Sequence, residues 1–172
     1  RVTCGSWQDL WLNEGFATYS EALYFETKYG KGLYKSEIAA DMENAKYAVG
    51  TLYVQNISSI SEIFDNNRSY SKGSVVLHML RNVVGNSVFF RILKTYLEEP
   101  ELKYNTAVTE DFQAVCERIS GMNLDYFFNQ WIYGENCPAY SAEMFFEQTE
   151  NSNYIVTVNL NQSINSNPQF FT

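Results

Sequence analysis

Apolar residues recur at helical spacing through most of this chain of 172 residues, and the spacing changes only near the end. The helix over 70–84 has so few polar positions that we expect it to be buried on most sides. Clusters of Gly, Asn and Ser predict irregular chain between 49 and 67. In full, the pattern predicts helices over about 7–29, 33–48, 70–84, 88–98, 109–120 and 123–131.

Helix boundaries are also marked in the sequence. Ser6 followed three residues later by Asp9 resembles a capping box, which places the start of the first helix near Trp7. Thr109 is expected to cap the helix that follows it, and Gly121 to end that helix. These signals predict where helices start and stop, not how they pack.

After the last predicted helix the apolar positions alternate, which is typical of strands. We expect strands over 140–147 and 154–160, joined as a hairpin, and the beginning of a further strand at 170–172. A lone hairpin is marginal in water. The chain is therefore expected to divide into a helical unit, residues 1–136, and the first strands of an incomplete β domain, residues 137–172. The predicted fold class is mainly α.

Composition excludes several classes of function. A net charge of -8, from 12 basic and 20 acidic residues, argues against nucleic acid as a partner, because phosphates require clustered Lys and Arg. No apolar run approaches the roughly 20 residues that a membrane span requires. Cys4, Cys116 and Cys137 are odd in number and widely spaced, which predicts neither a zinc knuckle nor a disulfide framework.

Two short motifs raise a chemical question. Glu14 stands among large apolar residues in WLNEGFA, residues 11–17, and an ionised carboxylate is costly to bury unless it is paired, hydrogen-bonded or bound to a metal. Tyr70 begins the motif YSKG at the start of the buried helix. Taken singly, each is read more simply as a structural residue. The only histidine, His78, is read as a satisfied or partly exposed core residue.

Together the motifs closely resemble the M1 family of zinc aminopeptidases. The resemblance covers about residues 2–140, and its motifs occur in the right order and at plausible intervals. The segment 9–19, DLWLNEGFATY, is highly specific, whereas YSKG is specific only in this context. The matching positions are Val2, Thr3, Trp7, 9–19, Glu21, 70–73, Phe127, Phe128, 130–132 and Pro138.

The resemblance implies a fold and a set of roles. The chain would be the helical half of a thermolysin-like metallopeptidase domain, followed by a β-hairpin that begins a truncated β-sandwich. Glu14 would be the third zinc ligand, after two His of an H-E-x-x-H motif, and Tyr70 would hydrogen-bond the oxyanion of the tetrahedral intermediate. Gly15 would let a neighbouring backbone approach closely. Glu21 is a candidate for orienting a ligand or a neighbouring helix, although a solvent-facing Glu21 is equally compatible.

The H-E-x-x-H motif is not in this sequence, and in the family it would lie upstream of Arg1. We therefore expect a fragment of an enzyme that hydrolyses N-terminal residues from peptides with metal-activated water. The parent would use zinc, but the fragment is expected to bind none and to be inactive. Surfaces exposed by truncation are expected to allow self-association. The alternative is a non-catalytic helical binding or scaffold module that retains the pattern, and the encoded sequence before Arg1 would distinguish the two.

Overall fold

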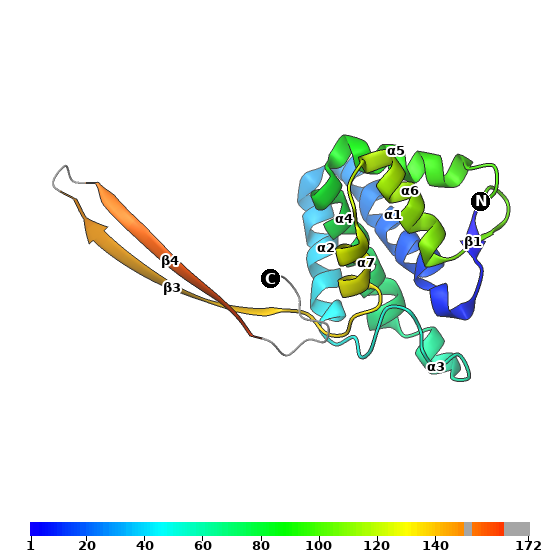
Figure 1. The fold of residues 1–172 in the computed structure, drawn as a ribbon, viewed down its shortest axis with the longest axis horizontal. Coiled ribbons are helices and arrows are strands. Elements are labelled where there is room, and N and C mark those ends of the chain that lie inside the picture. The colour runs from blue at the N-terminus through cyan, green and yellow to red at the C-terminus, as the bar shows by residue number, and fades with distance from the viewer. Residues whose placement is uncertain (150–152, 164–172) are drawn as a thin grey trace.

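The structure is a computed structural model and describes residues 1–149 and 153–163, which form a helical body and a long hairpin extending away from it (Figure 1). In chain order the elements are β1 (Thr3–Cys4), η1 (Trp7–Asp9), α1 (Trp11–Tyr29), α2 (Lys31–Ala45), α3 (Ile60–Ile63), η2 (Asn66–Lys72), α4 (Gly73–Val84), α5 (Asn86–Glu98), β2 (Thr106–Ala107), α6 (Thr109–Ser120), α7 (Asp125–Trp131), β3 (Ala139–Gln148) and β4 (Tyr154–Ser163). The prediction of a mainly helical fold followed by a hairpin is confirmed.

Helix α1 is central in the body, where it packs against α2, η2 and α4, while α5 packs against α6. Its buried face carries Trp11 and Tyr19, and the aromatic core continues across the body through Phe89, Phe112 and Phe128. The ring of Phe112 lies 5.1 Å from that of Phe16 and 5.1 Å from that of Tyr96, between centroids. The apolar positions that predicted amphipathic helices therefore meet in one core.

The start of α1 differs from the prediction. The segment Trp7–Asp9 is a separate 3₁₀ turn, and α1 begins only at Trp11. The capping box was wrong, because Ser6 donates its hydroxyl to Asp9 and caps no backbone N–H. The buried Asp9 carboxylate instead accepts hydrogen bonds from the backbone N–H and the hydroxyl of Thr109, at 3.1 and 2.7 Å. Asp9 therefore binds a residue 100 positions away, although its spacing from Ser6 suggested a local helix cap.

Other boundaries shift by a few residues. Helix α2 ends at Ala45 rather than 48, and α5 begins at Asn86, directly after Gly85 with φ +85°. Helix α6 begins at Thr109, but the N-cap position is Val108, whose N–H donates to the carboxylate of Asp111. Gly121 ends α6 in the left-handed conformation, as predicted.

Two features were not predicted. The first three residues of the predicted helix over 70–84 belong to a π-helical turn, η2, which spans Asn66–Lys72, and regular α4 starts only at Gly73. In addition, β1 and β2 pair in parallel, with Thr3 opposite Thr106 and Cys4 opposite Ala107. Two-residue strands are too short to leave an alternating pattern, so the sequence could not show them.

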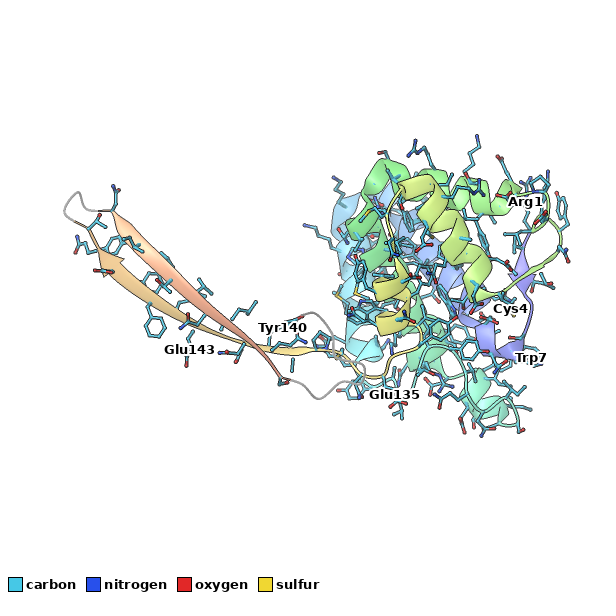
Figure 2. The ribbon with its side chains drawn as sticks, viewed as in Figure 1. Arg1, Cys4, Trp7, Glu135, Tyr140 and Glu143 are labelled. Carbon is cyan, nitrogen blue, oxygen red and sulfur yellow. The ribbon has the colours of Figure 1, made fainter. Side chains whose placement is uncertain are left out.

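The hairpin has one apolar and one mostly polar face. β3 and β4 pair antiparallel with Met144 opposite Val158 and Phe146 opposite Val156, so these four side chains share a face. These apolar side chains are all at least half exposed. Figure 2 shows Tyr140 and Glu143 on this hairpin, beyond the helical body. The further strand predicted at 170–172 lies outside the described residues.

Among the helices in the described part of the chain, none combines the length and apolarity required to cross a membrane.

Candidate functional site

The helices α1 and α4 touch through two glycines, one from each motif. A Cβ placed on Gly15 would lie 2.8 Å from the Cα of Gly73, and a Cβ on Gly73 would lie 2.8 Å from the Cα of Gly15. Real Cβ atoms do not come that close, so any larger residue at either position would force the helices apart. The expectation that Gly15 admits a close neighbouring backbone is met, and Gly73 is that neighbour.

This crossing brings together the two predicted site residues, which are 56 positions apart in sequence. Glu14 precedes Gly15 in the first turn of α1, and Tyr70 is in η2, three residues before Gly73. Burial, and after it the charge of Glu14, raises the pKa of the Tyr70 hydroxyl above its ordinary value. The hydroxyl therefore stays protonated at neutral pH and is available as a hydrogen-bond donor.

Both side chains remain available for an external partner. Glu14 and Tyr70 are each partly buried. Within residues 1–149 and 153–163, neither the Glu14 carboxylate nor the Tyr70 hydroxyl makes a hydrogen bond or an ion pair. This arrangement suits a ligand with a positive charge that contacts the Glu14 carboxylate and an oxygen that accepts a hydrogen bond from the Tyr70 hydroxyl.

The residues around Glu14 fix its helix in place. Asn13 accepts a hydrogen bond from the N–H of Cys4 at 2.9 Å and donates its amide to the Thr3 hydroxyl at 3.2 Å, which ties β1 to α1. The indole N–H of Trp11 donates to the hydroxyl of Thr109 at 3.0 Å. Within residues 11–15, the side chains of Trp11 and Asn13 thus make hydrogen bonds to other parts of the body, whereas the Glu14 carboxylate makes none among the described residues.

Glu21 lies two turns after Glu14 on α1 and is exposed. Its charge acts on Asp41 of α2. Burial raises the pKa of the Asp41 carboxyl, the hydroxyls of Ser74 and Ser71 lower it, and the Glu21 charge raises it again. The structure thus places Glu21 near a second carboxylate rather than in contact with Glu14 or Tyr70, and its role in orienting a ligand remains a prediction.

His78 belongs to a separate hydrogen-bonded network. Its Nδ1 lies 2.7 Å from the hydroxyl of Tyr34, which in turn lies 2.9 Å from that of Tyr19. Arg81, one turn further along α4, forms a bidentate ion pair with Glu26 at 2.8 and 3.2 Å. Burial lowers the pKa of His78, and the neighbouring Arg81 charge lowers it further. His78 is therefore a neutral, hydrogen-bonded core histidine, as its sequence context indicated.

A single carboxylate does not make a zinc site. In the described part of the chain, no three side chains of His, Cys, Asp or Glu converge on one point. Glu14 nevertheless fits one position of such a site, because carboxylate oxygens are zinc ligands and this one has no other partner among the described residues. The signal that sequence reasoning missed is Gly73, which reads as an ordinary helix start until the crossing with Gly15 is seen.

The profile of the peptidase family M1 domain matches residues 1–131. Aminopeptidase N of Lactococcus lactis subsp. lactis is 31% identical over 153 residues, which are 83% of this chain and 18% of that protein. The crystal structure of an M1 zinc metallopeptidase from Deinococcus radiodurans superposes with a TM-score of 0.68 at 27% identity, covering 80% of this chain and 30% of that one. The E323A mutant bound to a Tyr-Ser-Ala substrate superposes at 0.65 and 26% identity, covering 76% and 29% of the two chains.

Proposed function

Because this chain belongs to peptidase family M1, we propose that it is part of a zinc aminopeptidase, in which Glu14 is a metal ligand and Tyr70 stabilises the transition state. The observation that carries this proposal is the crossing of Gly15 with Gly73, since it joins the two motifs at one point. The Glu14 carboxylate and the Tyr70 hydroxyl have no partner among the described residues, which supports a role for both beyond packing.

The proposed activity is that of a longer protein. The chain spans about a fifth of the length of the curated relatives it matches, at 18% of the Lactococcus protein. The Deinococcus enzyme was crystallised with a peptide beginning in tyrosine, which supports peptides as the substrate class here. We infer that the remaining zinc ligands and the general base come from residues outside these 172.

Glu14 is proposed to supply one carboxylate to a three-ligand zinc site with a fourth position open. A zinc ion bound there would polarise the peptide carbonyl and activate water for attack. The first turn of α1 holds Glu14 rigidly, because Asn13 and Gly15 on either side of it are anchored to β1 and α4. Rigid support of this kind is what a metal ligand needs to keep its geometry.

Tyr70 is proposed to donate its hydroxyl to the oxygen that becomes negative when the substrate carbonyl is attacked. A donor positioned where charge develops contributes on the order of 3 kcal/mol to lowering the barrier. The raised pKa of Tyr70 suits this role, since the proton must remain on the phenol at the pH of the reaction.

The 172 residues alone are proposed to be inactive, because one carboxylate cannot hold zinc in stoichiometric amounts. We further propose that residues 137–172 are the first strands of a β-sandwich separate from residues 1–136. The apolar face of the hairpin supports this division, since such a face requires a second layer. The same face supports self-association of the isolated chain.

The proposal is tested in the zinc-containing enzyme that includes this chain. Tyr70→Phe is expected to lower kcat by about 100-fold to 1000-fold, with zinc content and KM unchanged, because the lost hydrogen bond forms only in the transition state. Glu14→Gln is expected to lower zinc content measured by atomic absorption. Tyr104→Phe is the matched control, since Tyr104 is 76% exposed and lies away from the crossing.

A Tyr70→Phe enzyme that retained wild-type kcat would make Tyr70 a structural residue. A Glu14→Gln enzyme with full zinc content would remove Glu14 from the metal site. The same measurements on a Glu21→Gln enzyme test whether Glu21 orients a ligand. If zinc affinity and activity are both unchanged, Glu21 has no such role. One equivalent of zinc in the isolated 172 residues would contradict the proposed inactivity.

A further inference from the structure

Two buried cations occupy the turn that carries Tyr70, on its other side. Arg68 is 7% exposed and Lys72 is 6% exposed, and both belong to η2. In a π-helix, with hydrogen bonds from residue i to i+5, residues four apart lie close to one face, and the residue midway between them faces away. Arg68 and Lys72 therefore share the side of η2 opposite to Tyr70.

Neither cation has an acidic partner in the described part of the chain. The guanidinium of Arg68 donates to two backbone carbonyls, those of Val49 and Glu62, and its buried Nε–H meets no acceptor. Among residues 1–149 and 153–163, the Lys72 amine makes no hydrogen bond or ion pair. Buried charges in proteins are normally paired, and an unsatisfied one calls for a missing water, ion or ligand. By contrast, the other partly buried cation, Arg81, has its own carboxylate.

Burial lowers the pKa of the Lys72 amine to about 8. The charges of Cys137 and Glu135 act in the opposite direction, and the charge of Arg68 lowers the pKa further. Glu135 is exposed and lies where the chain leaves the helical body (Figure 2). The groups present around Lys72 therefore do not compensate for the loss of water around its charge.

Lys72 opens onto a pocket of about 280 Å³ between the end of α2 and the segment that leads into β3. Lys46, Asn136 and Cys137 also line the pocket. Three methyl side chains, those of Ala45, Ala48 and Ala139, make up the remaining wall. A pocket with a buried amine and a wall of methyl groups matches an anion that carries a short aliphatic chain.

We propose that this pocket binds a short-chain carboxylate, whose oxygens accept hydrogen bonds from Lys72 while its alkyl group contacts the three alanines. A single negative charge suffices, because Lys46 is already paired with Glu43. Arg68 does not line the pocket, and its role is to add positive potential behind Lys72. The site lies on the far side of η2 from Tyr70 and does not depend on the proposed peptidase function.

The test is a titration of the 172-residue chain, labelled with ¹³C at the lysine ε-carbons, with butyrate, acetate and chloride at equal ionic strength. Butyrate is expected to raise the pKa of the Lys72 amine, followed by its ε-carbon resonance, by at least about one unit, because a bound anion favours the charged amine. Butyrate should bind more tightly than acetate, by about fourfold for each added methylene. Chloride should produce neither change.

Lys72→Met is expected to abolish the response of the amide resonances of Ala45, Ala48 and Ala139 to butyrate, since methionine fills similar space without charge. Lys103→Met is the matched control, because Lys103 is exposed and its loss changes the net charge equally. Equal shifts with chloride, or a butyrate response that survives Lys72→Met, would overturn the proposal. If the Lys72→Met variant failed to fold, the unaltered chain would still test the proposal: a rise in the pKa of Lys72 with butyrate but not with chloride would support it, and equal effects would overturn it.

Discussion

The helical body and the hairpin use aromatic and aliphatic side chains in opposite ways. In the body, large rings such as those of Trp11, Phe89 and Phe112 are removed from solvent almost completely. In the hairpin, Phe146 is 67% exposed and Leu160 is 66% exposed. The two regions do not differ in how apolar their sequences are. They differ in whether a second element covers the apolar face.

This difference shows where the stability of the chain resides. The five long helices of the body, α1, α2, α4, α5 and α6, pack against one another, so their fold is supported by tertiary contacts. The hairpin is held by its backbone ladder and by cross-strand pairs, and such units are marginal in water. Substitutions in the body should therefore cost stability, whereas equivalent ones in the hairpin should not.

The largest expected effect is that of Phe112→Ala. The ring is fully buried and contacts the rings of Trp11, Phe16, Tyr96 and Phe128, so its removal leaves a cavity. The free energy of unfolding should fall by about 3 to 5 kcal/mol, measured by urea denaturation followed by circular dichroism at 222 nm. A loss below about 1 kcal/mol would mean that the aromatic cluster is not the core of the body.

A smaller loss is expected for Gly15→Ala. The new methyl group would meet the backbone of Gly73 at 2.8 Å, and overpacking of this kind costs about 1 to 3 kcal/mol. Gly32→Ala in α2 is the control, because a Cβ there has no neighbour within 4 Å. That variant should gain up to about 1 kcal/mol from helix propensity. Equal effects of the two substitutions in the same denaturation assay would show that the crossing is not tight.

The smallest effect on stability is expected for Phe146→Ser in the hairpin. The side chain is already exposed, so the free energy of unfolding should change by less than about 0.5 kcal/mol. Sedimentation velocity should show weaker self-association, because the apolar face formed with Met144, Val156 and Val158 is interrupted. A loss of stability comparable to that of Phe112→Ala would instead mean that the hairpin face is covered.

Much of the candidate site could be predicted from the sequence, because its parts belong to continuous motifs. Glu14 stood out as a carboxylate in an apolar helix, and Tyr70 as the start of YSKG in a buried one. That each motif contains a glycine was visible, but that the two glycines touch each other was not. That Arg68 and Lys72 share one side of η2 was also missed, since η2 is π-helical and the sequence predicted no helix before residue 70.

The expected caps at Ser6 and Thr109 failed for the same reason. Ser6 and Asp9 read as a capping box, yet Asp9 is used by Thr109, which no local rule could anticipate. The same Thr109 hydroxyl accepts the indole N–H of Trp11. Side chains that resemble local caps can equally serve distant partners, and only the assembled core decides which use prevails.

By itself, the sequence determined the helical segments, the hairpin and the two motifs, because hydrophobic periodicity and turn residues act over a few neighbouring positions. The tertiary structure alone decided that Gly15 meets Gly73, that the charge of Glu14 acts on the Tyr70 hydroxyl, and that Lys72 is buried with no ion pair among residues 1–149 and 153–163. The reason is physical. Close backbone approach and burial of charge are set by how helices pack, and packing joins residues that no local pattern relates.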